Sequence, residues 1–247
     1  VEIEIVNEYV RGNIHLTKVD SEYPDNKLTG ATFEVYKDSN ANGKLDDGDE
    51  LLGTLTEKEI GEYGMNDLFY GRYFVKETKA PEGFVLDTGV YEVMIDTNGK
   101  TYEVENKAGV GFINDAMRGN LKIVKTSSDG KVKGFAFRIT GANGYDIILE
   151  TNDKGEIFIG GLRIGDYTIS EVSNSASSMY VLPADKKATV KLGSTTIVEM
   201  HNVLRDTPKT GDTTNLPLLY AFAGLSAVGI AVCGVIDFKK KKKEDRN

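Results

Sequence analysis

Residues 7–18 read NEYVRGNIHLTK, and residues 114–125 read NDAMRGNLKIVK. The two stretches share Asn, Arg, Gly, Asn and Lys at the same positions, and residues 201–209, HNVLRDTPK, begin a third copy in which Asn202 takes the place of the leading Asn. A stretch that recurs in this way is typical of a chain built from repeated structural modules.

Further matches lie between the repeated stretches. GATF at 30–33 corresponds to GFAF at 134–137, and the pattern Leu-x-x-Gly-x-Tyr-x-x-x-Glu occurs at 68–77 and again at 162–171. We therefore expect one module at 12–117 and a second at 118–204, with residues 1–11 as the last strand of a truncated upstream module.

Short runs of alternating apolar and polar residues fill both modules. TFEVY, RYFVKE, YEVMI, TYEVE, DIILE and EIFIG are separated by Gly, Asn and Asp, which is typical of strands joined by turns. The stretch TNGK at 97–100 predicts a two-residue hairpin between two strands. No stretch before residue 205 has a sustained helical period, so we predict an all-β fold of tandem, Ig-like antiparallel β-sandwiches.

The composition excludes several classes of function. A net charge of −8 argues against a nucleic-acid partner, which would require a basic face. With one Cys and two His, one chain can form neither a disulfide framework nor a zinc cluster, and little is left for a nucleophilic active site. We therefore expect a protein that is not an enzyme and requires no cofactor.

The C-terminal region carries a long apolar segment. Residues 217–236 read PLLYAFAGLSAVGIAVCGVI without a charge, and a helix of this length spans about 30 Å, the thickness of the hydrocarbon core of a bilayer. A run of lysines, Lys239 to Lys243, follows it. By the positive-inside rule this predicts a transmembrane helix at 216–238, a cytoplasmic tail at 239–247 and an extracellular location for the preceding modules.

The residues before this segment resemble a Gram-positive cell-wall sorting signal of the LPxTG type, which we place at 205–247. The resemblance implies that a sortase cleaves after Thr210 and joins its carbonyl to an amine of peptidoglycan or of a neighbouring pilin subunit. The protein would then be a secreted cell-wall protein that is held in the membrane only before sorting. Thr207 stands where the family has Leu, and an uncleaved tail anchor is the alternative. The implied recognition residues are Thr207, Pro208, Lys209, Thr210 and Gly211.

Strand alternation places three polar residue types on the apolar face of both modules. Ile14 and Leu16 lead on this face to Lys18, because alternate side chains of a strand share a face. The same alternation selects Glu and Asn near the ends of other strands. The six residues are Lys18, Glu77 and Asn114 in the first module, and Lys125, Glu171 and Asn202 in the second.

Burial of these groups has a chemical consequence. Desolvation favours a neutral amine, which is a nucleophile, and a protonated carboxyl, which can polarise an amide carbonyl. Attack of the lysine on the Asn side chain with loss of ammonia would give a Lys–Asn isopeptide bond, assisted by Glu77 or Glu171. Alternatively, the charged side chains lie at strand ends and extend to water.

Together these residues resemble the SpaA-type pilin and collagen-adhesin B-type (Cna B) domains, which have a prealbumin-like fold. Residues 77–84, ETKAPEGF, are close to the Glu-Thr-x-Ala-Pro-x-Gly-Tyr signature of that family, whereas the second module departs from it after Glu171. The resemblance implies autocatalytic bonds between first and last strands, Lys18–Asn114 and Lys125–Asn202. Asn106 has the same strand parity and is the alternative to Asn114, but Asn114 is favoured because it corresponds to Asn7 in the repeated stretch.

Residues 38–49, DSNANGKLDDGD, have the spacing of a calcium-binding EF-hand loop, with oxygen ligands at positions 1, 3, 5, 9 and 12 and Gly43 at position 6. The flanking runs read as strands rather than helices, and a solvated acidic loop is an equally good interpretation. The candidate Ca²⁺ ligands are Asp38, Asn40, Asn42, Lys44, Asp46 and Asp49.

The favoured function is a cell-wall-anchored surface stalk, either a pilin subunit or the stem of an adhesin. Few residues separate Asn202 from the sorting motif, which favours a pilin, but the family's Tyr-Pro-Lys motif is absent, with Asp25 in the lysine's place. One alternative is a module that binds a host extracellular-matrix protein. Another is the tether of an enzyme located upstream.

Overall fold

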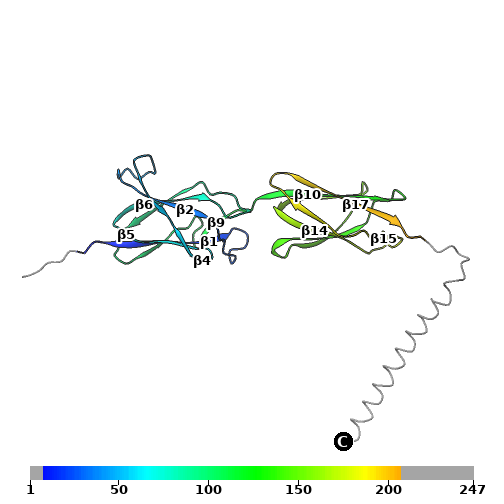
Figure 1. Ribbon diagram of the computed structural model, residues 1–247, viewed down its shortest axis with the longest axis horizontal. Helices are drawn as coiled ribbons and strands as arrows, with labels where there is room; N and C mark the ends of the chain where they lie inside the picture. The colour runs from blue at the N-terminus through cyan, green and yellow to red at the C-terminus, as the bar shows by residue number, and fades with distance from the viewer. Residues whose placement is uncertain (1–7, 207–247) are drawn as a thin grey trace, which may run out of the picture. The chain divides into compact units, whose positions relative to one another are not determined.

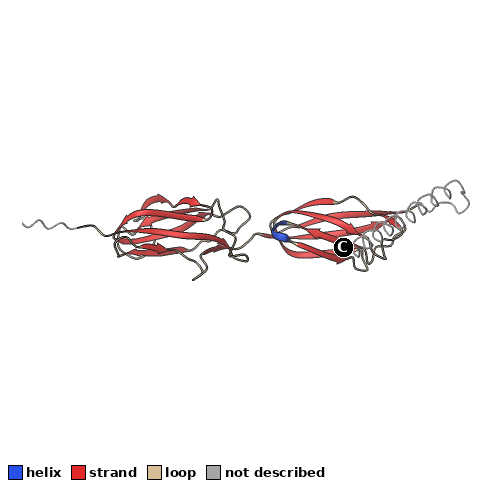
Figure 2. Ribbon diagram, turned by 90° about the horizontal axis from the view of Figure 1, so that it is seen from below, coloured by secondary structure: helices blue, strands red, loops and turns tan. Residues whose placement is uncertain are grey.

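The computed structural model describes residues 8–206, which fold into β-strands that form four sheets (Figure 1, Figure 2). The only helix in this part of the chain is a single 3₁₀ turn, Ala142–Gly144. The prediction of an all-β fold is therefore confirmed for the described residues. None of their helices is long and apolar enough to cross a membrane. The predicted membrane span at 216–238, the sorting motif at 207–211 and residues 1–7 lie outside the described residues.

The first module consists of strands β1 to β9, which form two facing sheets. One sheet has the order β4-β5-β1-β8, with β9 also paired to β1, and the other has the order β3-β2-β6-β7. The strands are β1 Arg11–Asp20, β2 Thr32–Lys37, β3 Glu50–Thr54, β4 Thr56–Glu59, β5 Glu62–Phe69, β6 Gly71–Lys79, β7 Val90–Ile95, β8 Thr101–Glu103 and β9 Phe112–Asn114.

The second module consists of strands β10 to β17 in two sheets of the same design. Their orders are β13-β10-β17-β15 and β12-β11-β14-β16. The strands are β10 Arg118–Ser127, β11 Ala136–Thr140, β12 Asp146–Glu150, β13 Glu156–Arg163, β14 Gly165–Val172, β15 Tyr180–Val181, β16 Lys186–Val190 and β17 Thr195–Leu204.

The first and last strands of each module pair in parallel, which differs from the expected wholly antiparallel sheets. β1 pairs in parallel with β8 and β9, and β10 pairs in parallel with β17. Parallel neighbours require a long connection between them. Here the whole of the rest of the module supplies that connection, so the chain enters at one end of the sheet and leaves at the other.

The predicted hairpin at 97–100 is wrong, although its turn is present. The N–H of Lys100 donates to the carbonyl of Thr97, and Gly99 has a φ of 75°, as a tight turn requires. The strands on either side of it lie in different sheets, however, because β7 pairs with β6 whereas β8 pairs with β1. The turn therefore carries the chain from one layer of the sandwich to the other.

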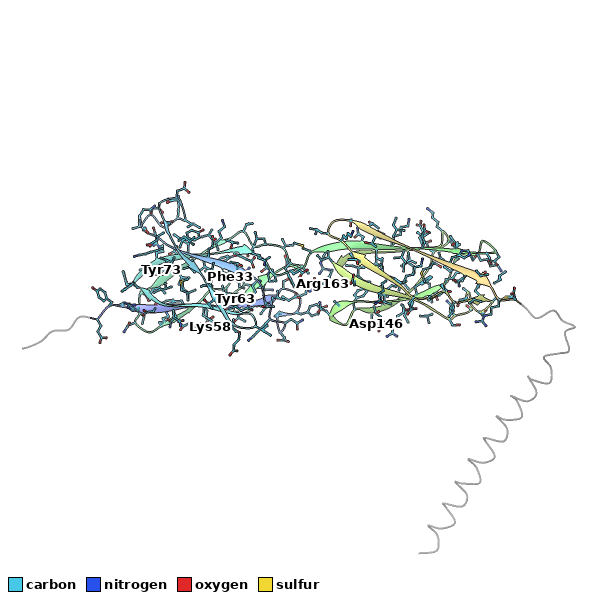
Figure 3. All side chains as sticks on the ribbon, viewed as in Figure 1. Phe33, Lys58, Tyr63, Tyr73, Asp146 and Arg163 are labelled. Atoms are coloured by element: carbon cyan, nitrogen blue, oxygen red, sulfur yellow. The ribbon has the colours of Figure 1, made fainter. Side chains whose placement is uncertain are left out.

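Alternation along the strands fills the space between the sheets. On β1, residues Ile14 and Leu16 are fully buried on one face, while the residues between them and beside them are only partly buried. Phe33, Tyr63 and Tyr73, labelled in Figure 3, are buried in the first module, and the rings of Phe33 and Tyr63 pack edge to face with their centroids 5.3 Å apart. The same face of β1 continues to Lys18.

The residues shared by the two modules have shared structural roles. Tyr73 and Tyr167 each donate their hydroxyl to the backbone carbonyl of the residue four positions earlier, which ties the start of β6 or β14 to the preceding strand. A Cβ on Gly12 or Gly119 would lie 2.9 Å from the carbonyl oxygen of Lys100 or 2.1 Å from that of Lys191. The repeated glycine therefore leaves room for a neighbouring backbone at the start of each module.

Candidate functional site

In the first module, Lys18, Glu77 and Asn114 are all almost completely buried. Lys18 and Asn114 come from the paired strands β1 and β9, where Lys18 is opposite Phe112 and Asp20 is opposite Asn114. Glu77 lies on β6 of the facing sheet. The Lys18 amine and the Asn114 amide thus enter the interior of the sandwich from one sheet, and the Glu77 carboxyl enters it from the other.

The carboxyl and the amide are in direct contact. Asn114 Nδ2 donates to Glu77 Oε2 at 2.7 Å, and the same oxygen accepts the backbone N–H of Asp87 at 2.8 Å. Glu77 Oε1 and Asn114 Oδ1 are buried without a hydrogen-bond partner among the described residues. A buried carboxylate oxygen without a partner is unfavourable, so the environment of Glu77 favours protonation of its carboxyl.

The lysine amine is held beside the strand that carries the amide. Lys18 Nζ donates to the backbone carbonyl of Phe112 at 2.9 Å, two residues before Asn114, and lies 5.4 Å from the centroid of the Phe112 ring. In this state its hydrogen bond is with the backbone rather than with the side chain of Asn114. For an isopeptide bond to form, the Lys18 amine would have to break its hydrogen bond with the Phe112 carbonyl and approach the side-chain carbonyl carbon of Asn114.

Burial favours the neutral form of both ionisable groups. Desolvation lowers the pKa of Lys18 to about 8, although the nearby carboxylates of Glu77 and Asp87 oppose the shift. Desolvation also raises the pKa of Glu77 above its usual value, against the hydrogen bonds from Asn114 and Asp87. Burial thus increases the share of uncharged amine and of protonated carboxyl, although a pKa of about 8 leaves most of the Lys18 amine charged at neutral pH.

The second module repeats the contact between the carboxyl and the amide, but its lysine amine donates to the backbone carbonyl of Thr126, the next residue on β10, rather than to the opposite strand. Asn202 Nδ2 donates to Glu171 Oε1 at 2.6 Å, and Glu171 Oε2 and Asn202 Oδ1 are buried without a partner among the described residues. Lys125 is buried with its amine 4.2 Å from the centroid of the Phe135 ring. Burial lowers the pKa of Lys125 and raises that of Glu171.

The register of the strands is the same in the two modules. On β10 and β17, Lys125 is opposite Met200, and Asn202 lies two residues further along. Glu77 and Glu171 are opposite Phe33 and Phe137 on their neighbouring strands. The six residues selected by strand alternation therefore gather as two equivalent Lys–Glu–Asn clusters.

Asn106, the competitor of Asn114, has a different environment. Its Nδ2 donates to Asp87 Oδ2 at 2.6 Å and to the carbonyl of Ile113 at 2.8 Å, and its Oδ1 accepts the N–H of Ile113 at 2.7 Å. Its hydrogen bonds go to these two residues, and the amide in contact with Glu77 is that of Asn114.

Asp87 is a residue of this site that the sequence analysis missed. It lies outside the strands, in the segment between β6 and β7, where periodicity gives no information. The one local signal was the Asp-Thr-Gly sequence at 87–89, since Asp87 Oδ1 accepts the N–H of Gly89 at 2.6 Å in an Asx turn.

The acidic loop at 38–49 is folded by hydrogen bonds among its own side chains. Asp46 accepts hydrogen bonds from the side chains of Asn40 and Asn42, and Asp49 accepts the N–H groups of Ser39 and Asp46. The Lys44 N–H donates to Asn42 Oδ1, and the buried Asp38 carboxylate accepts the N–H of Gly43 and pairs with Arg72. Among the described residues, no group of three or more His, Cys, Asp or Glu is arranged to hold a metal. Calcium binding stays a prediction.

The fold and the two buried clusters define a protein of tandem prealbumin-like β-sandwiches. The SpaA family, described as a prealbumin-like fold domain, matches residues 12–108 and 119–203. The chain belongs to this family.

Comparison with individual proteins gives similar results. The chain is 27% identical over 194 residues to the trypsin-resistant surface T6 protein of Streptococcus pyogenes serotype M6, a match that covers 66% of this chain and 34% of the relative. The TIE protein of Bacillus anthracis has a solved structure that resembles this one with a TM-score of 0.59 and 24% identity, over 78% of this chain and 34% of that one. The chain thus spans about a third of the length of both.

A minor pilin of Streptococcus agalactiae, GBS52, is 19% identical over 81% of this chain and 99% of that one, with a TM-score of 0.38.

Proposed function

We propose that this chain is part of a cell-wall-anchored surface stalk, a pilin subunit or the stem of an adhesin, whose modules are cross-linked by Lys–Asn isopeptide bonds. The bonds join Lys18 to Asn114 and Lys125 to Asn202, and Glu77 and Glu171 promote them. Membership of the SpaA family and the likeness to a streptococcal surface protein support this function.

The observation that carries the proposal is the presence of the same buried cluster at the same register in both modules. An isolated buried charge is strongly unfavourable. Reaction of the neutral lysine amine with the Asn amide removes the ionisable amine from the interior. A structural role alone would be met equally well by apolar side chains of similar volume.

The chemical step balances without another reactant. The lone pair of the neutral Lys18 Nζ attacks Cγ of Asn114, and the new C–N bond replaces the bond from Cγ to Nδ2. The protonated Glu77 carboxyl donates to Asn114 Oδ1 as negative charge develops there, and the carboxyl relays a lysine proton to the departing Nδ2. The products are a secondary amide and ammonia. Lys125, Glu171 and Asn202 follow the same course.

Intact mass spectrometry of the chain tests this function. We expect a deficit of two ammonias in the wild-type chain and of one ammonia in each of the variants Glu77→Ala and Glu171→Ala. Peptide mapping should find Lys18 joined to Asn114 and Lys125 joined to Asn202. An unmodified mass in a well-folded wild-type chain would contradict the proposal.

Attachment to the wall forms a second part of the proposed function. We propose that a sortase cleaves the chain after Thr210 and transfers the new carboxyl end to an amine of peptidoglycan or of a neighbouring subunit. The order of the TPKTG motif, the apolar segment and the basic tail supports this role. A membrane would hold the chain only before this transfer.

Incubation of the chain with a sortase and a small amine acceptor tests the attachment. The product should carry the acceptor at Thr210, and Thr210→Ala should block its formation, whereas Thr213→Ala, just beyond the motif, should not. Equal products from the wild-type chain and Thr210→Ala would rule out this attachment site.

A further inference from the structure

The last strand of the first module is interrupted, whereas that of the second is continuous. In the second module, Asn202 lies on the 10-residue strand β17, which pairs with β10 from Asn120 opposite Thr195 to Ser127 opposite Asn202. In the first module, the equivalent pairing is divided between β8 and β9, each of 3 residues, and residues 104–111 lie between them. Asn114 therefore lies on a short strand, which pairs with β1 on one side and is followed by a backbone hydrogen bond from Val85 to Asp115.

Asn106, within the interruption, adds a further contact to this strand just before Asn114. Its side-chain amide makes two hydrogen bonds with Ile113, accepting the N–H at 2.7 Å and donating to the carbonyl at 2.8 Å. This is the pattern that a neighbouring strand would offer to the backbone. Because Ile113 immediately precedes Asn114, the contact fixes the backbone from which the reactive amide projects.

Asp87 connects this support to the carboxyl of the cluster. Its Oδ2 accepts the second N–H of Asn106 at 2.6 Å and the hydroxyl of Tyr91 at 2.8 Å, and its backbone N–H donates to Glu77 Oε2 at 2.8 Å. A carboxylate only accepts hydrogen bonds, so it determines which end of the Asn106 amide faces it. One residue thereby orients both Glu77 and, through Asn106, the strand of Asn114.

These groups also line an opening to the solvent. A hollow of about 420 Å³ is bounded by Asp87, Tyr91, Asn106, Ile113 and Asn114, with Val85, Leu86, Thr88 and Asp115 completing its wall. Asn114 itself is among the residues that line this hollow.

We propose that Asp87 and Asn106 are positioning residues for isopeptide formation in the first module. They fix the backbone that carries the reactive Asn, as continuous strand pairing does in the second module. This inference rests on the proposed isopeptide chemistry. A displacement of about 1 Å of a reacting group can slow a reaction roughly a hundredfold. Loss of either side chain should therefore slow the first bond and leave the second unaffected.

The test compares the two bonds within one chain. The full 247-residue chain is made by cell-free synthesis, samples are quenched in acidic denaturant over time, and peptide mass spectrometry gives the fraction of each bond. The variants are Asp87→Ala and Asn106→Ala. Thr88→Ala, an exposed neighbour that also lines the hollow, is the matched control.

We expect Asp87→Ala and Asn106→Ala to slow the Lys18–Asn114 bond about tenfold to a hundredfold, with the Lys125–Asn202 bond at its wild-type rate. Thr88→Ala should leave both rates unchanged. Wild-type formation of the first bond in both Ala variants would overturn the inference. Absence of both bonds from the wild-type chain would instead overturn the proposed function and this inference with it.

Two further variants separate positioning from a general loss of folding. Asn106→Asp places a second carboxylate beside Asp87 and should slow formation of the first bond. The double variant Asn106→Asp/Asp87→Asn should restore part of this rate, because the amide and the carboxylate have then exchanged positions. Tyr91→Phe keeps the ring that packs against Phe112 and removes only the hydroxyl that donates to Asp87. Tyr91→Phe should slow formation of the Lys18–Asn114 bond a few-fold. A wild-type rate in Tyr91→Phe, together with no recovery of the rate in the double variant, would contradict the inference.

Discussion

Glu77 and Asn114, on facing layers of the first sandwich, are joined by a hydrogen bond of 2.7 Å between Oε2 and Nδ2. Glu171 and Asn202 repeat it at 2.6 Å in the second module. In both pairs the other carboxylate oxygen and the amide oxygen are buried without a partner among the described residues. The arrangement that brings the carboxyl to the amide is therefore a property of the module rather than of one site.

The cross-link should contribute measurably to the stability of each module. A bond that closes a loop of roughly 80–100 residues stabilises by about 4 kcal/mol if it acts on the unfolded chain as a disulfide does. We expect Glu77→Ala to lower the thermal transition of the first module only, and Glu171→Ala that of the second, as calorimetry would show. Lys18→Met also prevents the first bond and should lower the same transition, but by less than Glu77→Ala, because it leaves no free amine in the interior. Transitions unchanged in all three variants would contradict this expectation.

The buried lysine should make an uncross-linked module sensitive to pH. In Asn114→Ala, Lys18 stays free, with a folded pKa of about 8 against an ordinary value of 10.5. Between these values the unfolded chain binds more protons, so the unfolding free energy should rise with pH, by up to about 1.4 kcal/mol per pH unit.

The matched control for this titration is the double variant Lys18→Met/Asn114→Ala, which lacks the titrating amine. Subtracting its urea-denaturation data between about pH 7.5 and 9.5 removes the contribution of the tyrosines, which begin to ionise in the unfolded chain near the top of this range. If the two variants have the same pH dependence, Lys18 is not held with a lowered pKa.

The repeated glycine at the start of each module should be intolerant of a side chain. In Gly119→Ala, the new Cβ would lie 2.1 Å from the carbonyl oxygen of Lys191, so the backbone must shift. We expect a loss of about 2–4 kcal/mol in the second module, measured by urea denaturation. Gly160→Ala is the control, because its Cβ has 3.5 Å to its nearest neighbours. Equal stability of the two variants would show that the backbone adapts freely.

The loop at 38–49 provides a test of calcium binding. If it binds, we expect a calorimetric titration of the chain with Ca²⁺ to give one site with a Kd of about 10⁻⁴–10⁻³ M, as in extracellular modules. Asp46→Asn should weaken it, while Asp146→Asn, in the second module, should not. Absence of heat at millimolar Ca²⁺ would leave the loop as a hydrogen-bonded turn.

Strand alternation was sufficient to predict which side chains lie in the interior. Lys18 follows Ile14 and Leu16 on the inner face of β1 because the period of a strand is two, whatever the strand pairs with. The polar type of the residue did not alter its placement. The all-β fold and the inner location of the six residues of the clusters could therefore be read from the sequence.

The pairing of the strands could not be predicted in the same way. The turn at 97–100 forms as its residues indicate, but a turn does not determine which sheet the next strand joins. Asp87 was beyond prediction for a related reason, since it acts from a loop, and Asn106 had the correct parity but a role that depends on the interruption of its strand. Such roles arise from contacts between segments distant in sequence.

The parallel pairing of first and last strands has a consequence for the integrity of the chain. Lys18 lies near the end of β1 and Asn114 at the end of β9, so a bond between them turns residues 18–114 into a closed ring that contains most of the loops of the module. The polypeptide then has two covalent routes through the module. A protease that cuts any single loop within such a ring would open it without separating the two ends of the chain.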